Sequence, residues 1–179
     1  MIRRFARPYA RALLDVAGSP QRANTVRAEL EKFEQARRES AELHDVYANP
    51  GIELDAKFKI THAIASRLGL SDLTGKVLEV LIRNHRINDL DSVVDALASM
   101  INEQLNIAVV DVRSANKLTE QELAQLRKTL EQKLGKRVEV RPEIDPSLIG
   151  GFVVRIGSEI LDASVVGKIH RFRVSLTSP

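Results

Sequence analysis

The sequence predicts an α+β protein in which an N-terminal six-helix bundle, residues 1–105, is followed by a small C-terminal β-α-β-β-β-α domain, residues 106–179. Apolar residues recur at the helical period throughout the first range, and the period shortens to two residues in the second. With 179 residues, of which 44% are hydrophobic, the chain can bury a core without covalent cross-links. We therefore expect two folded units in sequence.

Start and stop signals divide the first range into helices. Proline suits a first helical turn, serine caps a helix start, and glycine or asparagine ends a helix. On these signals the expected helices run from Pro8 to Gly18, from Ser19 to about Ser40, from Ser40 to Asn49, from Asp55 to Gly69, from Ser71 to Asn84, and from Asn88 or Asp89 to Leu105. Their short connections predict antiparallel neighbours in a bundle.

The second range begins with a strand, because Ala108, Val110 and Val112 alternate with residues of the opposite face. Thr119 and Glu122 have the spacing of a capping box, which opens an amphipathic helix. The other expected elements are the end of that helix at Gly135, strands at Val138–Arg141, Phe152–Ile156 and Glu159–Leu161, a hairpin turn at Gly157 and Ser158, and a last helix from Ser164 to about Leu176.

Composition excludes several kinds of chemistry. The chain has no cysteine, so disulfides, thiolate metal sites and thiol nucleophiles are ruled out. The four histidines, at positions 44, 62, 85 and 170, lack the spacing that brings two metal ligands together on a helix. The sequence also lacks a glycine-rich phosphate loop and a nucleophile elbow. We expect no metal, no other cofactor and no catalysis by this chain.

Charge and hydropathy indicate neither a strong polyanion binder nor a membrane span. The net charge is +3, and residues 1–104 carry 15 basic and 15 acidic side chains, so the excess belongs to the second range. No stretch approaches the roughly 18 apolar residues that a membrane-spanning helix needs. We therefore expect a protein that does not cross a bilayer.

An RNA-binding or ribosome-associated two-domain factor is the alternative function. A small basic β-α-β-β unit with a glycine pair is similar to KH-like folds, which bind RNA. A KH clamp uses a GXXG loop, however, whereas Gly150 and Gly151 are adjacent and lead directly into a strand. The aromatic content of 4%, without tryptophan, also disfavours base stacking. We interpret the glycine pair as a bulge or a close backbone approach.

A specific combination of residue types and spacings lies between Val138 and Ser164. Its members are Asp145, Leu148, Ile149, Gly150, Gly151, Phe152, Arg155, Gly157, Asp162 and Ser164. This pattern resembles the C-terminal signature of the delta subunit of F-type ATP synthases, the oligomycin-sensitivity-conferring protein family. Three stretches of the first range are also similar to this family. Arg7–Leu13 resembles its first helix, Asn49–Pro50 resembles the stop in the middle of its helical domain, and Asn84–Ile87 resembles the end of its fifth helix.

The resemblance implies a non-catalytic peripheral-stalk subunit, a stator that stands at the cytoplasmic face of a bacterial inner membrane as a peripheral membrane protein. It implies that the helical domain binds N-terminal segments of the alpha subunits on the catalytic head, and that the smaller domain binds the C-terminal segments of the b subunits. Such a tie stops the head from turning with the rotor, so that proton flow stays coupled to ATP synthesis.

The apolar faces of the first and fifth expected helices are unusually wide. Each spans an arc of about 200°, whereas a helix packed on one core needs little more than about 100°. Both helices are then either central in the bundle or walls of a groove for a partner helix, and with the resemblance we favour the groove. The expected alpha-subunit interface consists of Tyr9, Ala12, Val16, Val80 and Asn84.

The final expected helix carries an apolar stripe formed by Val165, Ile169 and Phe172. We expect this stripe to contribute to the b-subunit interface, with Lys168, Arg171 and Arg173 beside it to steer an acidic helix. Phe172 is equally compatible with a plain core position. The signature residues Asp145, Leu148, Gly150, Gly151, Gly157, Asp162 and Ser164 are expected to act through the fold rather than by contacting a partner.

Overall fold

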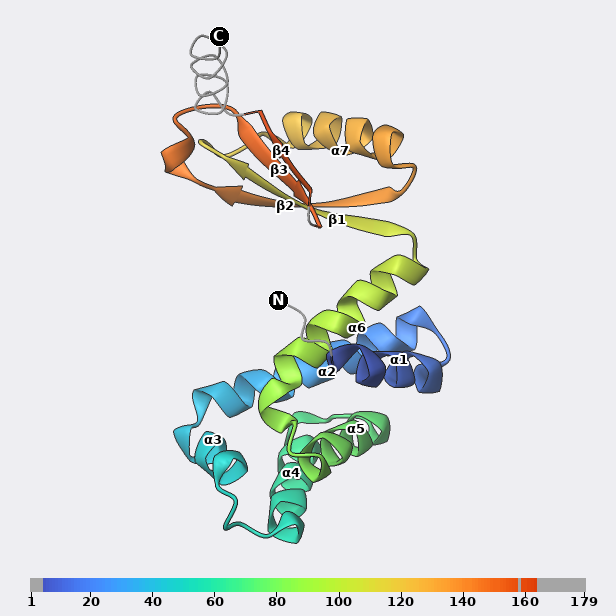
Figure 1. Cartoon of the computed structure of the whole chain (residues 1–179), viewed down its shortest axis with the longest axis vertical. Coiled ribbons are helices and arrows are strands. Elements are labelled where there is room, and N and C mark those ends of the chain that lie inside the picture. The colour runs from blue at the N-terminus through green and yellow to red at the C-terminus, as the bar shows by residue number, and fades with distance from the viewer. Residues whose placement is uncertain (1–4, 158, 164–179) are drawn as a thin grey trace, which may run out of the picture. The chain divides into compact units, whose positions relative to one another are not determined.

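A computed structural model of the chain describes residues 5–157 and 159–163. The chain divides into two compact units, Met1–Leu105 and Asn106–Pro179 (Figure 1). The described residues hold seven α-helices, six in the first unit and one in the second, together with one four-stranded sheet. The expected α+β class is therefore confirmed, and the expected last helix lies outside the described residues.

The helices of the first unit begin and end within two residues of the expected positions. They are α1 (Ala6–Ala17), α2 (Pro20–Glu39), α3 (Ala41–Ala48), α4 (Leu54–Leu68), α5 (Asp72–Arg83) and α6 (Leu90–Gln104), with a 3-10 turn, η1 (Ile87–Asp89), before α6. Serine caps fix three of the starts, because the hydroxyls of Ser19, Ser40 and Ser71 each accept a hydrogen bond from a backbone N–H three residues on.

The first helix begins at Ala6, two residues before the expected start. Pro8 then lies in the first turn, where its missing N–H has no partner to lose. Phe5 precedes the helix without a side-chain cap, and its ring packs on the core while the Arg86 guanidinium lies 4.4 Å from the ring centroid. Hydrophobic packing and a cation–π contact thus hold this helix start in place of a cap.

The core of the first unit is built where α1 and α2 pack on α6 and where α4 packs on α5. Its largest fully buried side chains are those of Phe33, Leu30, Leu78, Leu81, Ile82, Leu90, Leu97 and Val93. These residues come from α2, α5 and α6, so those three helices supply most of the interior.

A charge network centred on a buried pair joins α2 to η1 and α6. Glu34 and Arg37 are buried and paired, with 2.7 Å between Oε1 and Nη2, and Nη1 of Arg37 donates to Oδ1 of Asn88 at 3.2 Å. Arg38 bridges Glu34 to Asp91 on α6. Because the two buried charges neutralise each other and each has further hydrogen-bond partners, the network is satisfied internally.

A carboxylate on α2 also fastens the start of α5. Glu29 accepts hydrogen bonds from the backbone N–H of Ser71 at 2.9 Å, from the Ser71 hydroxyl, and from the Thr74 hydroxyl. Burial raises the pKa of Glu29, but these hydrogen bonds and the nearby Lys32 outweigh it and hold the pKa below its ordinary value. The ionised form of Glu29 is therefore the form that joins these two helices.

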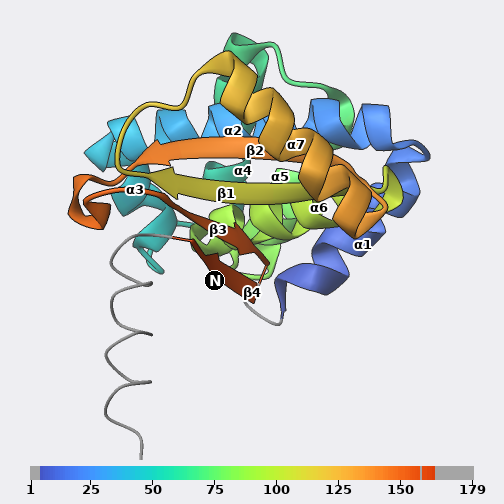
Figure 2. The ribbon, with the colours of Figure 1, turned by 90° about the horizontal axis from the view of Figure 1, so that it is seen from above.

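The second unit is a four-stranded sheet with a helix on one face (Figure 2). Its elements are β1 (Ile107–Ser114), α7 (Glu120–Leu134), β2 (Arg137–Ile144), a 3-10 turn η2 (Pro146–Leu148), β3 (Phe152–Ile156) and β4 (Glu159–Asp162). The strand order is β2-β1-β3-β4, in which β1 and β2 are parallel and the other pairs antiparallel. The helix α7 crosses between the two parallel strands, and Leu130 packs on Val110, Val112, Val138 and Val154.

The glycine-rich signature forms the turns that flank β3. Oδ1 of Asp145 accepts from the backbone N–H of Ser147 at 3.1 Å and thereby caps η2, which ends at Leu148. Gly151 has φ +80° directly before β3, and Gly157 has φ +60° in the β3–β4 hairpin. The position of Gly150 and Gly151 is thus a turn rather than a bulge within a strand, and the left-handed backbone explains the glycine at 151.

Candidate functional site

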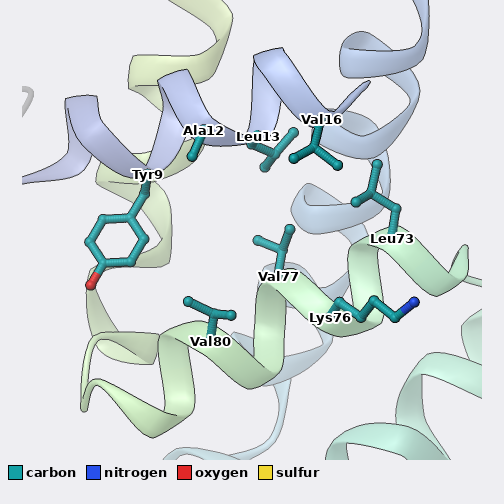
Figure 3. A pocket seen from close by; sticks show the side chains of 8 residues that line it. All are labelled: Tyr9, Ala12, Leu13, Val16, Leu73, Lys76, Val77 and Val80. Atoms are coloured by element: carbon teal, nitrogen blue, oxygen red, sulfur yellow. The ribbon is translucent and has the colours of Figure 1, made fainter. Parts of the chain in front are cut away.

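An apolar groove runs between α1 and α5 (Figure 3). Its volume is about 280 Å³. The lining side chains are those of Tyr9, Ala12, Leu13 and Val16 from α1, and of Leu73, Lys76, Val77 and Val80 from α5.

The groove exists because both helices present a second apolar stripe besides the one that faces the core. On each helix the lining residues repeat at three- and four-residue steps, which places them on one face. Leu13 is buried and forms the floor, whereas the side chains of Val16 and Val80 are 65% and 48% exposed. Large apolar side chains so exposed on facing walls are typical of a surface that another chain covers.

Polar atoms lie at the margins of the groove. The Tyr9 hydroxyl and the Lys76 ammonium stand near its two ends in Figure 3, away from the apolar middle. Nζ of Lys76 pairs with Oδ2 of Asp72 at 2.7 Å, and this hydrogen bond raises the pKa of Lys76. The Lys76 ammonium is therefore already paired, and the part of Lys76 that lines the groove is its methylene chain.

Four of the five expected interface residues line the groove: Tyr9, Ala12, Val16 and Val80. Asn84 does not. It follows the last residue of α5, and its side-chain amide donates to the Val80 carbonyl oxygen at 2.7 Å. Helical periodicity predicts Asn84 on the same face of the helix as Val80. The helix ends at Arg83, however, and the Asn84 side chain caps its last turn instead of lining the groove.

Four lining residues were not among the expected interface residues: Leu13, Leu73, Lys76 and Val77. The three apolar ones belong to the wide apolar arcs of these helices, so the signal for them was present in the sequence. Lys76 carried no such signal, because a charged residue interrupts an apolar stripe. Its methylene stem becomes part of the wall once α1 and α5 are seen side by side.

The groove offers binding rather than bond-making chemistry. Among the described residues, its lining includes no carboxylate, histidine or hydroxyl nucleophile other than the Tyr9 phenol. In residues 5–157 and 159–163, no three His, Asp or Glu side chains are grouped to hold a metal ion. Within the same residues, no helix is both long and apolar enough to span a bilayer.

The second expected interface falls where the chain is not described. Val165, Ile169 and Phe172 lie outside the described residues, as does the signature residue Ser164. In the described part of the second unit, large apolar side chains are exposed on β2, on β4 and in the turn before β3, namely Ile144, Ile160, Leu161 and Ile149.

Comparison with known proteins identifies one family. The family described as ATP synthase delta (OSCP) subunit matches residues 5–176. The ATP synthase subunit delta of Prochlorococcus marinus is 33% identical over 170 residues, covering 94% of this chain and 92% of the relative. The subunit delta of a Bradyrhizobium species is 30% identical over 165 residues, covering 92% and 89%.

One solved structure shares the fold over nearly the whole length. A chain of the Toxoplasma gondii mitochondrial ATP synthase hexamer aligns with a TM-score of 0.71, covering 99% of each chain at 23% identity. At that identity the likeness concerns the fold.

Proposed function

Since the chain belongs to the ATP synthase delta (OSCP) subunit family, whose members are structural stator subunits rather than catalytic ones, we propose that it ties the catalytic head to the b subunits of the peripheral stalk. The family rests on matches over almost the entire chain, and an RNA-binding role has no support from them. The two ends of the tie are assigned to the two units.

The observation that carries the proposal is the groove between α1 and α5. Its walls are apolar and partly exposed, and its length on each helix is about two turns, from Tyr9 to Val16 and from Leu73 to Val80. An amphipathic helix with apolar residues at i, i+3, i+4 and i+7 fits such a groove. The N-terminal segment of an alpha subunit is the proposed occupant, with Tyr9, Ala12, Val16 and Val80 as its main contacts.

The second unit is proposed to bind the C-terminal segments of the b subunits. Val165, Ile169 and Phe172 are the proposed contacts, on the strength of their helical spacing and of the basic residues beside them. With one unit on the head and the other on the stalk, the protein stands at the cytoplasmic face of the membrane without entering it.

The mechanism follows from mechanics rather than from chemistry. Rotation of the central stalk exerts torque on the head, and an untethered head turns with it. A tie that binds the head at one end and the stalk at the other resists that torque, so that rotation drives conformational change in the catalytic sites. The tie needs affinity and rigidity, and both apolar burial in the groove and the buried Glu34–Arg37 network can supply them.

Reconstitution tests the proposal. The purified protein is added to membranes and catalytic heads depleted of their own delta subunit, and head attachment is measured together with proton-driven ATP synthesis. We expect both to be restored in parallel. Restored attachment without recovery of coupled synthesis, or no attachment at all, contradicts the stator role.

A further inference from the structure

A second hollow in the first unit lies on a different side of α5, between the end of α3, the start of α4 and η1. Its volume is about 220 Å³, and it is lined by Tyr47, Ala48, Pro50, Lys57, Ile82, His85, Ile87 and Asn88. This hollow shares no residue with the groove between α1 and α5. The function proposed above therefore leaves it unexplained.

Lys57 is the unusual member of this hollow. Its side chain is buried, with only 5% of the residue exposed, and Nζ donates to the carbonyl oxygens of Asn49 at 2.8 Å and Tyr47 at 3.4 Å. No ion pair joins Lys57 to any carboxylate of the described residues. A buried ammonium without a carboxylate partner is costly, and the two carbonyl oxygens at the end of α3 offset some of that cost.

Two further residues of the lining, Asn88 and His85, bear on what the hollow can bind. Oδ1 of Asn88 accepts from Nη1 of Arg37 at 3.2 Å, which leaves the Asn88 amide N–H groups free to donate elsewhere. His85 also lines the hollow, and its backbone φ of +55° lies in the left-handed region that non-glycine residues rarely adopt. Strained backbone of this kind gathers at binding sites.

We propose that this hollow binds a small oxyanion, a carboxylate or a phosphate, through the ammonium of Lys57 and the amide of Asn88. An ammonium has three N–H donors, and two of them are occupied by the carbonyl oxygens of Tyr47 and Asn49. The third is available to an anion, and in the part of the chain that the structure describes no acidic side chain lines the hollow to compete for it. The volume admits an ion of this size together with a few waters.

The test measures thermal unfolding of the full chain with inorganic phosphate, and separately with acetate, each against chloride at equal ionic strength. At a phosphate concentration ten times the dissociation constant, we expect the melting temperature to rise by about 4 °C and the rise to saturate. Acetate distinguishes the source of the charge: a response to acetate alone assigns the site to a carboxylate, and a response to phosphate alone to free phosphate. No saturable response to either anion overturns the proposal.

Two variants and a matched control locate the effect. Lys57→Met removes the ammonium and keeps the stem, and Lys59→Met makes the same change at an exposed position of the same helix. Asn88→Asp places a carboxylate of the chain itself in the hollow, so it is expected to fold well and to lose the anion response even if Lys57→Met is unstable. Retention of the full response in Asn88→Asp and in folded Lys57→Met, as in Lys59→Met, overturns the assignment to this hollow.

Discussion

The substitution Ala12→Asp separates binding from folding at the α1–α5 groove. Ala12 is exposed on the α1 wall, so in the free protein the new carboxylate is solvated. The cost to folding is then mainly helix propensity, about 0.5 kcal/mol. In the proposed complex the alpha-subunit helix covers the carboxylate among Leu13, Val16 and Val77, whereas the donors of the groove, the Tyr9 hydroxyl and the Asp72-paired Lys76 ammonium, stand near its two ends.

Desolvation of that carboxylate is the dominant effect. An unpaired polar group buried in protein costs about 3 kcal/mol, which corresponds to an affinity about 150-fold weaker. For comparison, Val16→Ala removes two methyl groups from a side chain that is 65% exposed before binding, and its expected loss is about 1 kcal/mol, or about fivefold. The free-energy cost of burying the charge therefore exceeds the free energy lost with the contact area.

Calorimetric titration with a peptide of the alpha-subunit N-terminus measures the affinity, and urea unfolding measures stability. Ala63→Asp is the matched control, because Ala63 is exposed on α4 and does not line the groove. We expect the control to bind like the wild type. If Ala12→Asp folds normally and binds within twofold of the wild type, the groove is not the alpha-subunit site.

Three further predictions concern stability, pH and the second unit. Glu34→Ala leaves the buried Arg37 guanidinium without its carboxylate, so urea unfolding should show a loss of about 3 kcal/mol; a loss below about 1 kcal/mol contradicts this. The pKa of Glu29 is lowered in the folded state, so its link to α5 contributes stability above pH 4.5; the advantage of the wild type over Glu29→Gln should disappear as the pH falls through that lowered pKa, and a difference independent of pH contradicts this. Gly151→Val forces a β-branched residue to φ +80° and should cost about 2 kcal/mol of stability, whereas Phe172→Ala should mainly weaken binding of a b-subunit peptide; a stability loss in Phe172→Ala with unchanged affinity makes Phe172 a core residue.

Much of the fold was predictable because local signals mark its elements. Serines at positions 19, 40 and 71 and glycines at 18, 69 and 135 bound helices in the structure as the sequence indicated. The strand order β2-β1-β3-β4 was not predictable in this way, since it depends on pairing between distant segments. The buried pair Glu34–Arg37 was equally hidden, because two charged residues in a polar helix give no sign of burial.

The groove was partly predictable for a related reason. A wide apolar arc indicates surplus apolar surface, but it does not say whether the surplus faces a second helix of the bundle or a partner. The exposure of Val16 and Val80 shows that no helix among the described residues covers this surplus, which supports the proposal of a partner. Lys76 lines the groove because of the way α1 and α5 pack side by side. Asn84 does not line it because α5 ends at Arg83. Helical periodicity in the sequence predicts neither the packing of two helices nor the residue at which one of them ends.

Both walls of the groove are fastened to the same interior, and this bears on the work of a stator. The α5 wall is joined to α2 through Glu29, and the α1 wall packs on α6, which the Arg38–Asp91 pair joins to α2. The spacing of the walls is therefore set by α2 and α6 before any partner binds. Because the groove is already formed, little conformational entropy is lost when a partner binds. Because both of its walls are anchored to α2 and α6, the groove transmits a load without opening. The charged network on α2 thus supports the groove although none of its members lines it.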